Sequence, residues 1–395
     1  MKTLDQITVL DLTRLMPGYA TLILADFGAE VIKIEEPKFG DYFRSMGPKK
    51  DDLGYAFQII NRNKKSIKLN LKCKKSVEIF NKLVTKADVL VESFRPGVMK
   101  KLGLGYEKLC KLNPKLIYCS ISGYGQCGPY SNFSGHDVNY LALSGVIGLS
   151  KKKDGFPIEP SVPIADFESS QRAALAIVSA IFQRTKSKKG QYIDIAMFEG
   201  SIFWLTQPFA EYFATNNLPD PDRYIRPNDN HWVGSKPGYG IYKTCDGFLS
   251  IGAAEDKFWC NFCEAIGKVN LKDARANRSQ SAIEINTELN FELSKKTKAY
   301  WIKKFKIFDV PCMPVHDLSE VISDPHVSER GLFVEINKPG QNSIKVPSNS
   351  FGLSENQKVQ PKPAPKHGEH TDLVLSKMGI SKKLIAELHA SGEIK

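Results

Sequence analysis

The sequence predicts a large α/β domain with a parallel sheet, then a smaller α+β domain, then a return of the chain to the large domain. Two observations carry this prediction. Strand-like and helical segments alternate through the first third of the chain, an order that builds parallel α/β layers. A hairpin pattern at 240–252 then interrupts this alternation. The length of 395 residues also exceeds what one ordinary core accommodates.

The first strand–helix–strand unit is complete within 35 residues. A β-rich run at 7–13 precedes Pro17 and Gly18, which open a helix at 19–27. Glu30–Glu35 then alternates like a strand. The same alternation predicts the following further elements: strands at 66–71, 88–93 and 116–122, and a helix at 74–86.

The middle of the chain predicts two strong helices, at 137–147 and 167–184, then a strand at 191–197 and a helix at 201–213. A stretch at 216–230 is rich in Pro, Asp and Asn and is the expected linker. The remaining expectations are a hairpin (240–244 and 248–252), a helix at 256–266, a polar stretch at 270–290, a helix at 297–308, an irregular segment at 338–360 and a helical tail at 371–394. The expected domain boundaries are 1–199, 200–230, 231–325 and 326–395.

Composition excludes several classes of protein. No apolar run approaches the ~20 residues that span a bilayer, and the N-terminus carries acids where a secretory signal is apolar. The eight scattered cysteines form no disulfide framework, which favours a reduced, cytoplasmic protein. The one C-x-x-C, Cys260 and Cys263, falls in an apolar helical pattern, and the histidines share no ligand spacing with acids or cysteines. We therefore expect no metal.

The net charge of +12 has two interpretations. It indicates an anionic partner, such as nucleic acid, a membrane surface or a phosphorylated small molecule, or simply a lysine-rich surface. The lysines are spread along the whole chain, and no arginine- and aromatic-rich nucleic-acid module is present. We expect general surface charge plus a local phosphate site, with no nucleic-acid or membrane partner.

Four local patterns carry possible chemistry. Gly123, Gly125 and Gly128 formally match G-x-G-x-x-G, but the following residues indicate a loop rather than the helix that a dinucleotide site needs. A glycine loop that a ligand approaches closely fits better. His136 and Asp137 precede an apolar helix, where they form either a general base beside an anion-binding helix start or a plain cap. Further acids stand at two other predicted helix starts, Asp166 and Glu255, where capping is the simpler interpretation of each alone.

Taken together, segments along nearly the whole chain resemble the family III coenzyme A transferases, which include a racemase branch. The similar segments are 11–37, 94–107, 113–129, 135–145 (GHDVNYLALSG), 163–167 (PIADF), 189–200 and 239–259. The GHDVNYLALSG segment is most similar to the alpha-methylacyl-CoA racemase branch, because transferase relatives commonly carry a tyrosine where His136 stands. No dense glycine run of the transferase type appears between 225 and 260.

This resemblance implies a doubly wound, Rossmann-like large domain and an interlocked homodimer. It also implies that His136 and Asp166 are two bases on opposite faces of the α-carbon of an acyl-CoA thioester. The backbone N–H of Asp137 would hold the enolate oxygen, and Glu255, reaching in from the partner subunit, would orient His136. In the transferase branch, the residue that matches Asp166 is instead a nucleophile. Coenzyme A enters as part of the substrate, and no resident cofactor is implied.

Coenzyme A carries a 3′-phosphate and a diphosphate, which basic side chains near the turns after the strands would meet. Our candidates for coenzyme A contacts are Lys38, Arg62, Lys64, Arg95 and Tyr140. Each basic candidate has ordinary surface charge as its alternative. The run 233–238 departs from the Gly-Gly-Ala-Pro-like run of racemases. Lysine at position 38 stands where some relatives stack arginine on adenine, which lysine does less well.

Overall fold

The computed structural model describes residues 2–149, 155–215, 236–273, 281–337, 342–349, 353–354 and 360–394. The chain divides into two compact units. Unit 1 comprises residues 1–146, 160–204 and 326–395, and unit 2 comprises residues 147–159 and 205–325. The predicted linker at 216–230 and the first half of the run 233–238 lie outside the described residues.

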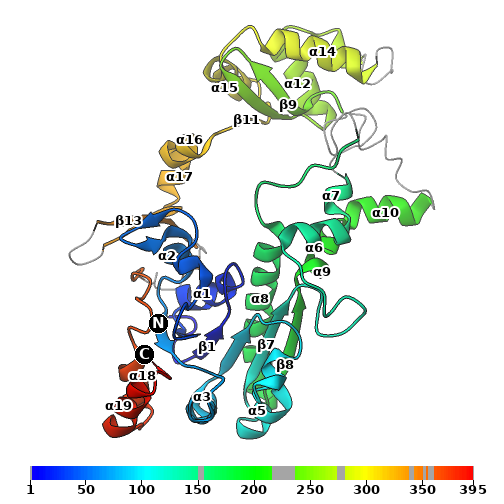
Figure 1. Ribbon diagram of the computed structural model, residues 1–395. Helices are drawn as coiled ribbons and strands as arrows, with labels where there is room; N and C mark the ends of the chain where they lie inside the picture. Colours follow the sequence, from blue (N-terminus) through cyan, green and yellow to red (C-terminus); the bar gives the residue numbers. More distant parts are fainter. Residues whose placement is uncertain are drawn as a thin grey trace. The chain divides into compact units, whose positions relative to one another are not determined.

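Unit 1 is built on a six-stranded sheet with the order β5-β2-β1-β6-β7-β8, and every neighbouring pair is parallel (Figure 1). The chain fills one half of this sheet outward from β1 and then crosses to β6 and fills the other half. This is the doubly wound arrangement expected above. In such sheets ligands usually bind in a crevice where the strand order reverses, which here is between β1 and β6. The strands are β1 (Thr8–Leu12), β2 (Glu30–Glu35), β5 (Lys65–Lys68), β6 (Val89–Glu92), β7 (Ile117–Ser122) and β8 (Gln191–Ala196).

Helices cover both faces of this sheet. On one face α1 packs against the long helix α8, which also contacts β7 and β8. On the other face α3, α5, α18 and α19 form a core with alternate sheet residues such as Leu10, Ile34 and Leu90. The helices of unit 1 are α1 (Gly18–Asp26), α2 (Tyr55–Ile60), α3 (Lys74–Lys86), α4 (Val98–Lys101), α5 (Tyr106–Leu112), α6 (Asp137–Ser144), α8 (Ile164–Ser187), α9 (Met197–Phe203), α18 (Thr371–Lys377) and α19 (Lys382–Ala390).

Three small elements complete unit 1. Two of them are hairpins, β3 (Lys49–Lys50) with β4 (Leu53–Gly54), and β12 (Phe333–Ile336) with β13 (Ile344–Pro347). The third is a 3-10 turn, Tyr42–Arg44. Two short helices lie where the units meet in sequence, α7 (Val146–Leu149) and α17 (Pro325–Glu329).

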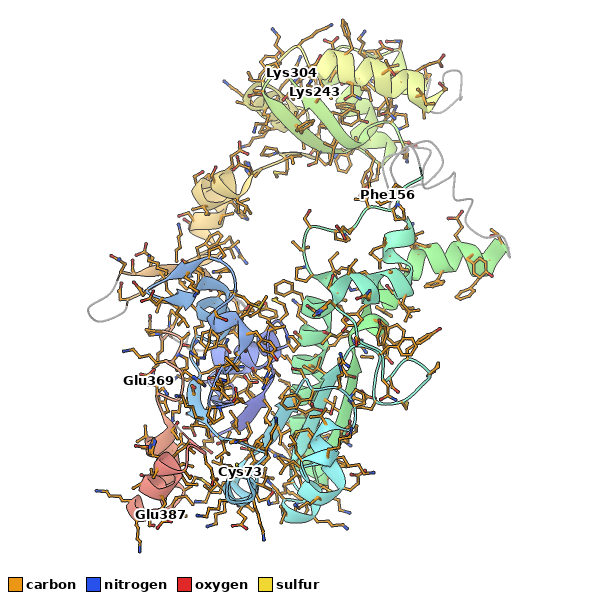
Figure 2. All side chains as sticks on the ribbon, in the orientation of Figure 1. Cys73, Phe156, Lys243, Lys304, Glu369 and Glu387 are labelled. Carbon is orange, nitrogen blue, oxygen red and sulfur yellow. The ribbon has the colours of Figure 1, made fainter. Side chains whose placement is uncertain are left out.

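Unit 2 has its own three-stranded antiparallel sheet, in the order β11-β10-β9, and its own core around Trp259, Phe262 and Phe305. Its strands are β9 (Tyr239–Thr244), β10 (Gly247–Gly252) and β11 (Cys312–Pro314). Its helices are α10 (Thr206–Thr215), α12 (Asp256–Ile266), α14 (Ala282–Leu293), α15 (Lys298–Ile307) and α16 (Leu318–Ser323). Charged side chains of both signs cover the two units, as Lys243, Lys304, Glu369 and Glu387 illustrate (Figure 2).

Four sequence predictions were wrong in detail. The polar stretch at 270–290 includes most of α14, which Ser281 starts with a capping box to Glu284. The segment predicted as irregular contains β13. The helical tail is two helices, because the chain turns at Gly379 with φ +78°. The single aromatic-rich helix predicted at 201–213 is divided between α9 and α10.

Candidate functional site

The starts of α6 and α8 lie together, joined by one carboxylate. Asp137, the first residue of α6, accepts a hydrogen bond of 3.1 Å from the backbone N–H of Asp166. Further backbone donors to Asp137 are Ile164 and Ala165, so its side chain caps α8 from another helix. Pro163 precedes α8 and provides no side-chain cap of its own. A cap across the fold therefore places the first turns of two helices side by side.

Asp166 lies in the first turn of α8 and is partly buried. Burial and the nearby charge of Asp137 raise the pKa of the Asp166 carboxyl to about 7. Burial also raises the pKa of Asp137, although the backbone N–H groups that it accepts oppose this shift. Among the described residues no lysine, arginine or histidine forms an ion pair with Asp166. An acid poised near neutral pH is suited to proton transfer.

His136 is the N-cap residue of α6, and its side chain is exposed. Its backbone N–H donates to Asn139 Oδ1 at 3.0 Å, which fixes the entry into the helix. The N–H of Asp137 makes no hydrogen bond within the described part of the chain. The start of α6 thus presents an imidazole and a free backbone donor from adjacent residues, next to the acid that starts α8.

Tyr140 and Arg95 lie next to these two helix starts. The hydroxyl of Tyr140 donates to the backbone oxygen of Gly135 at 2.6 Å, and Asp166 is close enough to raise the pKa of its phenol further beyond the effect of burial. Arg95 follows β6 and donates to Ser134 Oγ at 2.7 Å, two residues before His136. The structure therefore brings together four predicted residues of unit 1, His136, Asp137, Asp166 and Tyr140, with Arg95 on the loop beside them.

The glycine-rich loop after β7 has a structural explanation. A Cβ at Gly123 would lie 2.6 Å from the ring of Tyr140, and a Cβ at Gly135 would lie 2.7 Å from the same ring. The close approach that these glycines permit is therefore that of a tyrosine of the same chain. This side chain holds the loop against α6.

The other basic candidates fall into two groups. Arg62 is buried and pairs with Asp26 at 2.6 Å. Lys64 is also buried, and its ammonium contacts Asp11 at 3.0 Å and the backbone oxygen of Gly18 at 2.8 Å. The charges of both residues are neutralised inside the fold, so we assign them a structural role. Lys38, by contrast, is exposed after β2, with its ammonium 4.9 Å from the ring centre of Phe39.

One basic residue at the crevice was missed by the sequence reasoning. Arg14 is the second residue after β1, and its backbone N–H donates to Ser93 Oγ at 3.1 Å, next to the end of β6. Its guanidinium donates to the hydroxyl of Tyr42 and lies 5.7 Å from the ring centre of Phe94. The sequence offered one signal for this residue: it lies in the turn after the first strand, and the strand order reverses at that strand.

Glu255 belongs to unit 2, where it is exposed and is the N-cap residue of α12. The described residues contain no group of three or more His, Cys, Asp or Glu side chains that would hold a metal ion. Within the same residues, no helix is both long enough and apolar enough to cross a membrane.

A family model described as CoA-transferase family III matches residues 4–371. The chain belongs to this family. It is 36% identical to the succinyl-CoA:glutarate CoA-transferase of Mus musculus over 402 residues, covering 100% of this chain and 91% of the relative. It is also 32% identical to the alpha-methylacyl-CoA racemase of Homo sapiens over 410 residues, covering 98% of this chain and 96% of the relative.

Solved structures agree with this assignment. A CAIB/BAIF family protein from Brucella suis superposes with a TM-score of 0.83 at 26% identity, covering 95% of this chain and 99% of that one. The mixed α/β fold with its parallel sheet is therefore that of the CaiB/BaiF structures, and the protein is an enzyme of CoA-transferase family III.

Proposed function

We propose that this family III enzyme inverts the configuration at the α-carbon of 2-methylacyl-CoA thioesters by proton transfer between two bases. The observation that carries the proposal is Asp166, whose pKa is raised to about 7 by burial and Asp137 and which has no ion-paired cation among the described residues. Asp166 stands at the start of α8. Asp137, which follows His136 at the start of α6, caps α8 with its carboxylate and so holds the two helix starts together. Stereoinversion needs one group that removes a proton and a second group that returns one, and here two such groups lie at the starts of two helices.

Each residue of the site has a role in this proposal. One of His136 and Asp166 removes the α-proton, and the other returns a proton to the opposite face. The N–H of Asp137, free of other partners among the described residues, stabilises the enolate oxygen that forms between these steps. No covalent intermediate and no resident cofactor enter the reaction, and coenzyme A is part of the substrate.

The basic coenzyme A contacts that we propose lie on the loops that follow β1, β2 and β6. Arg95 and Lys38 keep their predicted role, and Tyr140 supports the loop between them and the reacting groups. We add Arg14, whose guanidinium lies at the crevice. Arg62 and Lys64 are left out, because their charged groups are already paired inside the fold.

An interlocked homodimer, with Glu255 supplied by the partner subunit, is part of the same proposal. It is supported by large apolar side chains that remain exposed on α8, at positions 175, 178 and 182, and by Phe203 and Trp204 at the end of α9. Such a patch is typical of a protein interface. A cytoplasmic location and the lack of a nucleic-acid or membrane partner stay predictions from the sequence.

Coenzyme A transfer between carboxylic acids is the second candidate, because the relative with 36% identity is named a CoA-transferase. In that reaction Asp166 attacks the thioester as a nucleophile. Its position at the start of α8 is compatible with either chemistry.

The deciding experiment follows (R)-2-methylacyl-CoA by proton NMR in deuterium oxide, first without and then with an added carboxylic acid. Loss of the α-proton signal with inversion, and no second acid present, is the expected result. Transfer of coenzyme A to the added acid without α-proton exchange would instead assign the second candidate. A hydroxylamine-trapped adduct at Asp166 would support that outcome.

A further inference from the structure

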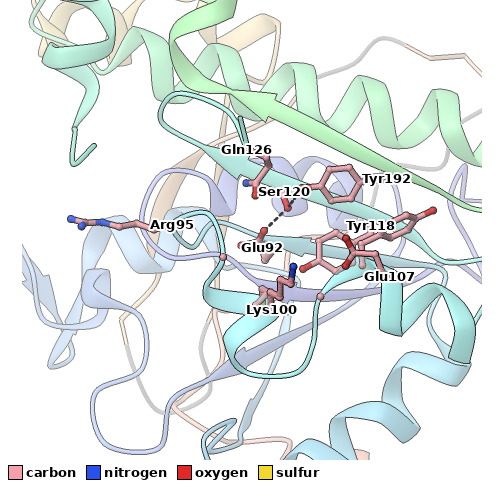
Figure 3. Close-up of a pocket in the computed structure, with 12 residues that line it drawn as sticks. Glu92, Arg95, Lys100, Glu107, Tyr118, Ser120, Gln126 and Tyr192 are labelled. Carbon is pink, nitrogen blue, oxygen red and sulfur yellow. Dashed lines mark hydrogen bonds between the residues drawn. The ribbon is translucent and has the colours of Figure 1, made fainter. Parts of the chain in front are cut away.

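A cavity of about 290 Å³ lies in unit 1 at the ends of β6 and β7, beside the loop at 94–97 and α5 (Figure 3). Its lining includes the acid Glu92, Ser120, Gln126 and three tyrosines, Tyr106, Tyr118 and Tyr192. Arg95 also contributes to the lining, but its guanidinium donates to Ser134, away from the other labelled side chains. The volume lies at the lower end of the range for ligand sites, so an acyl-CoA thioester does not fit inside it.

Glu92 is almost completely buried at this cavity. One carboxyl oxygen accepts from the hydroxyl of Ser120, and the other accepts from the backbone N–H of Phe94 at 2.7 Å. Both donors are neutral. Among the described residues no cation is ion-paired with Glu92, and nothing in the two-base mechanism uses it. A buried carboxylate in this state lacks the positive partner that it normally requires.

The walls around Glu92 are aromatic. The ring centres of Tyr106, Tyr118 and Tyr192 lie 5.2 to 5.9 Å apart. The hydroxyl of Tyr192 donates to Ser120 at 3.1 Å, which continues the chain of hydrogen bonds to Glu92. Aromatic faces attract cations through their negative π-surface. An acid surrounded by tyrosine rings is therefore a site for a compact organic cation.

Two further observations define the ligand. The side-chain nitrogen of Gln126 is buried and has no hydrogen-bond partner, so a polar ligand would satisfy it, directly or after rotation of the amide. Lys100 and Glu107 are both exposed among the lining residues, and their opposite charges offset each other. Solvent screens these exposed charges, so the buried carboxyl of Glu92 is the charged group that acts on a bound ligand with the least screening.

We propose that this cavity binds a small primary amine, with its ammonium group on Glu92 and its carbon skeleton against the three tyrosines. The amine is a separate ligand from the acyl-CoA substrate. Burial raises the pKa of the free Glu92 carboxyl to about 7, so an unoccupied cavity takes up a proton near neutral pH. Binding of an ammonium ion ionises Glu92 and releases that proton, and affinity rises as the pH rises through about 7.

The test is calorimetric titration of the full-length protein at pH 8 with benzylammonium chloride, compared with benzyl alcohol as its neutral analogue. We expect saturable binding of the amine and binding of the alcohol that is weaker by roughly tenfold or more. Glu92→Gln should weaken amine binding by a similar factor. Glu107→Gln is the matched control, because it removes an exposed acid from the same lining, and it should change the affinity by less than about threefold.

Three results would overturn the proposal. Equal binding of the amine and the alcohol would make the cavity merely apolar. Displacement of the amine by potassium chloride, but not by tetramethylammonium chloride at the same ionic strength, would make it an alkali-metal site. No saturable binding would leave no amine site at all. If Glu92→Gln does not fold, the carboxyl carbon of Glu92 in the unaltered protein is titrated by NMR, and saturating benzylammonium must lower its pKa.

Discussion

Asp11 and Asp166 are both acids of unit 1 that are withdrawn from solvent, yet their pKa values move in opposite directions. Asp11 is completely buried, with the ammonium groups of Lys64 at 3.0 Å and Lys33 at 4.0 Å. Burial favours its protonation, but these two lysines, together with hydrogen bonds from Thr13 and Thr21, outweigh burial and hold its pKa below the usual range. Asp166 has no such partner among the described residues, and burial together with Asp137 raises its pKa to about 7.

The difference separates a structural acid from a reactive one. The Asp11 network joins β1 to β2 and to the start of α1, since Lys33 also pairs with Asp41 at 2.9 Å and Lys64 bonds to Gly18. Asp11 itself therefore stays ionised near neutral pH, although burial lowers the pKa of its partner Lys64 to about 8. The charge on Asp166 is opposed by its surroundings, and that opposition gives the carboxyl its affinity for a proton.

Asp166→Asn should have the largest effect on activity. We expect the rate of α-proton exchange to fall by roughly 10³-fold or more, because the variant has no base at this position. The native state of the unaltered protein holds a proton on Asp166 up to about pH 7, whereas the unfolded chain loses it near pH 4. The stability that this proton gives the native state is therefore lost as the pH rises from about 4 to about 7. At pH 8 the ionised Asp166 destabilises the fold, so the variant should unfold there at the same or a higher temperature.

Exchange is measured by NMR in deuterium oxide, and thermal unfolding is followed by circular dichroism. Glu199→Gln, an exposed acid of α9, serves as the control and should retain activity. Unchanged exchange in Asp166→Asn would remove this residue from the reaction.

Asp11→Asn should have the largest effect on stability. The substitution leaves Lys33 and Lys64 buried without their shared carboxylate, and breaking a buried pair in this way typically costs about 3–5 kcal/mol. The free energy of unfolding is measured in urea at pH 7. Asp5→Asn, at an exposed acid, should stay within about 0.5 kcal/mol of the unaltered protein. A similar small change for Asp11→Asn would contradict the structural role given to the network.

Asp137→Asn should have the smallest of the three effects and sharpens the comparison most directly. It removes the negative charge beside Asp166 but keeps a side-chain oxygen that accepts from the N–H groups at the start of α8. The pKa of Asp166 should fall, and the midpoint of the rise of kcat/KM with pH should move down by about 0.5–1 unit. A pH–rate profile measures this shift. A midpoint that moves upward or stays in place would show that Asp137 does not tune the acid.

Local patterns predicted the strands of the large sheet well, because alternation of apolar residues and turn signals are properties of neighbouring residues. They also marked His136 and Asp166 as helix-start residues. They did not predict that Lys64 is buried, since its partner Asp11 lies 53 residues away in the sequence. The same limit applies to Asp137, whose role as the cap of α8 depends on residues 27 to 29 positions further along.

The missed elements have equally specific causes. The helix α14 begins with a capping box that the sequence displays as Ser281 and Glu284, but the surrounding polar composition hid it. The strand β13 is stable through pairing with β12 and through burial of Ile344 and Val346, which no local pattern encodes. The order of the six strands also depends on the tertiary fold, and it locates the crevice where Arg14 and Ser93 meet.

The last residues of the chain have a consequence for how the protein is made. Leu375, Leu388 and Ile394 belong to the same core as Leu10 and Ile34 of the first strands, and Glu393 hydrogen-bonds to Asn70 and Ser76. A ribosome releases the first strands long before it synthesises these residues, at a pace of roughly 5–20 residues per second. The nascent large domain therefore waits tens of seconds with this sheet face covered by α3 and α5 alone, and until the tail docks the remaining apolar surface is a target for a chaperone.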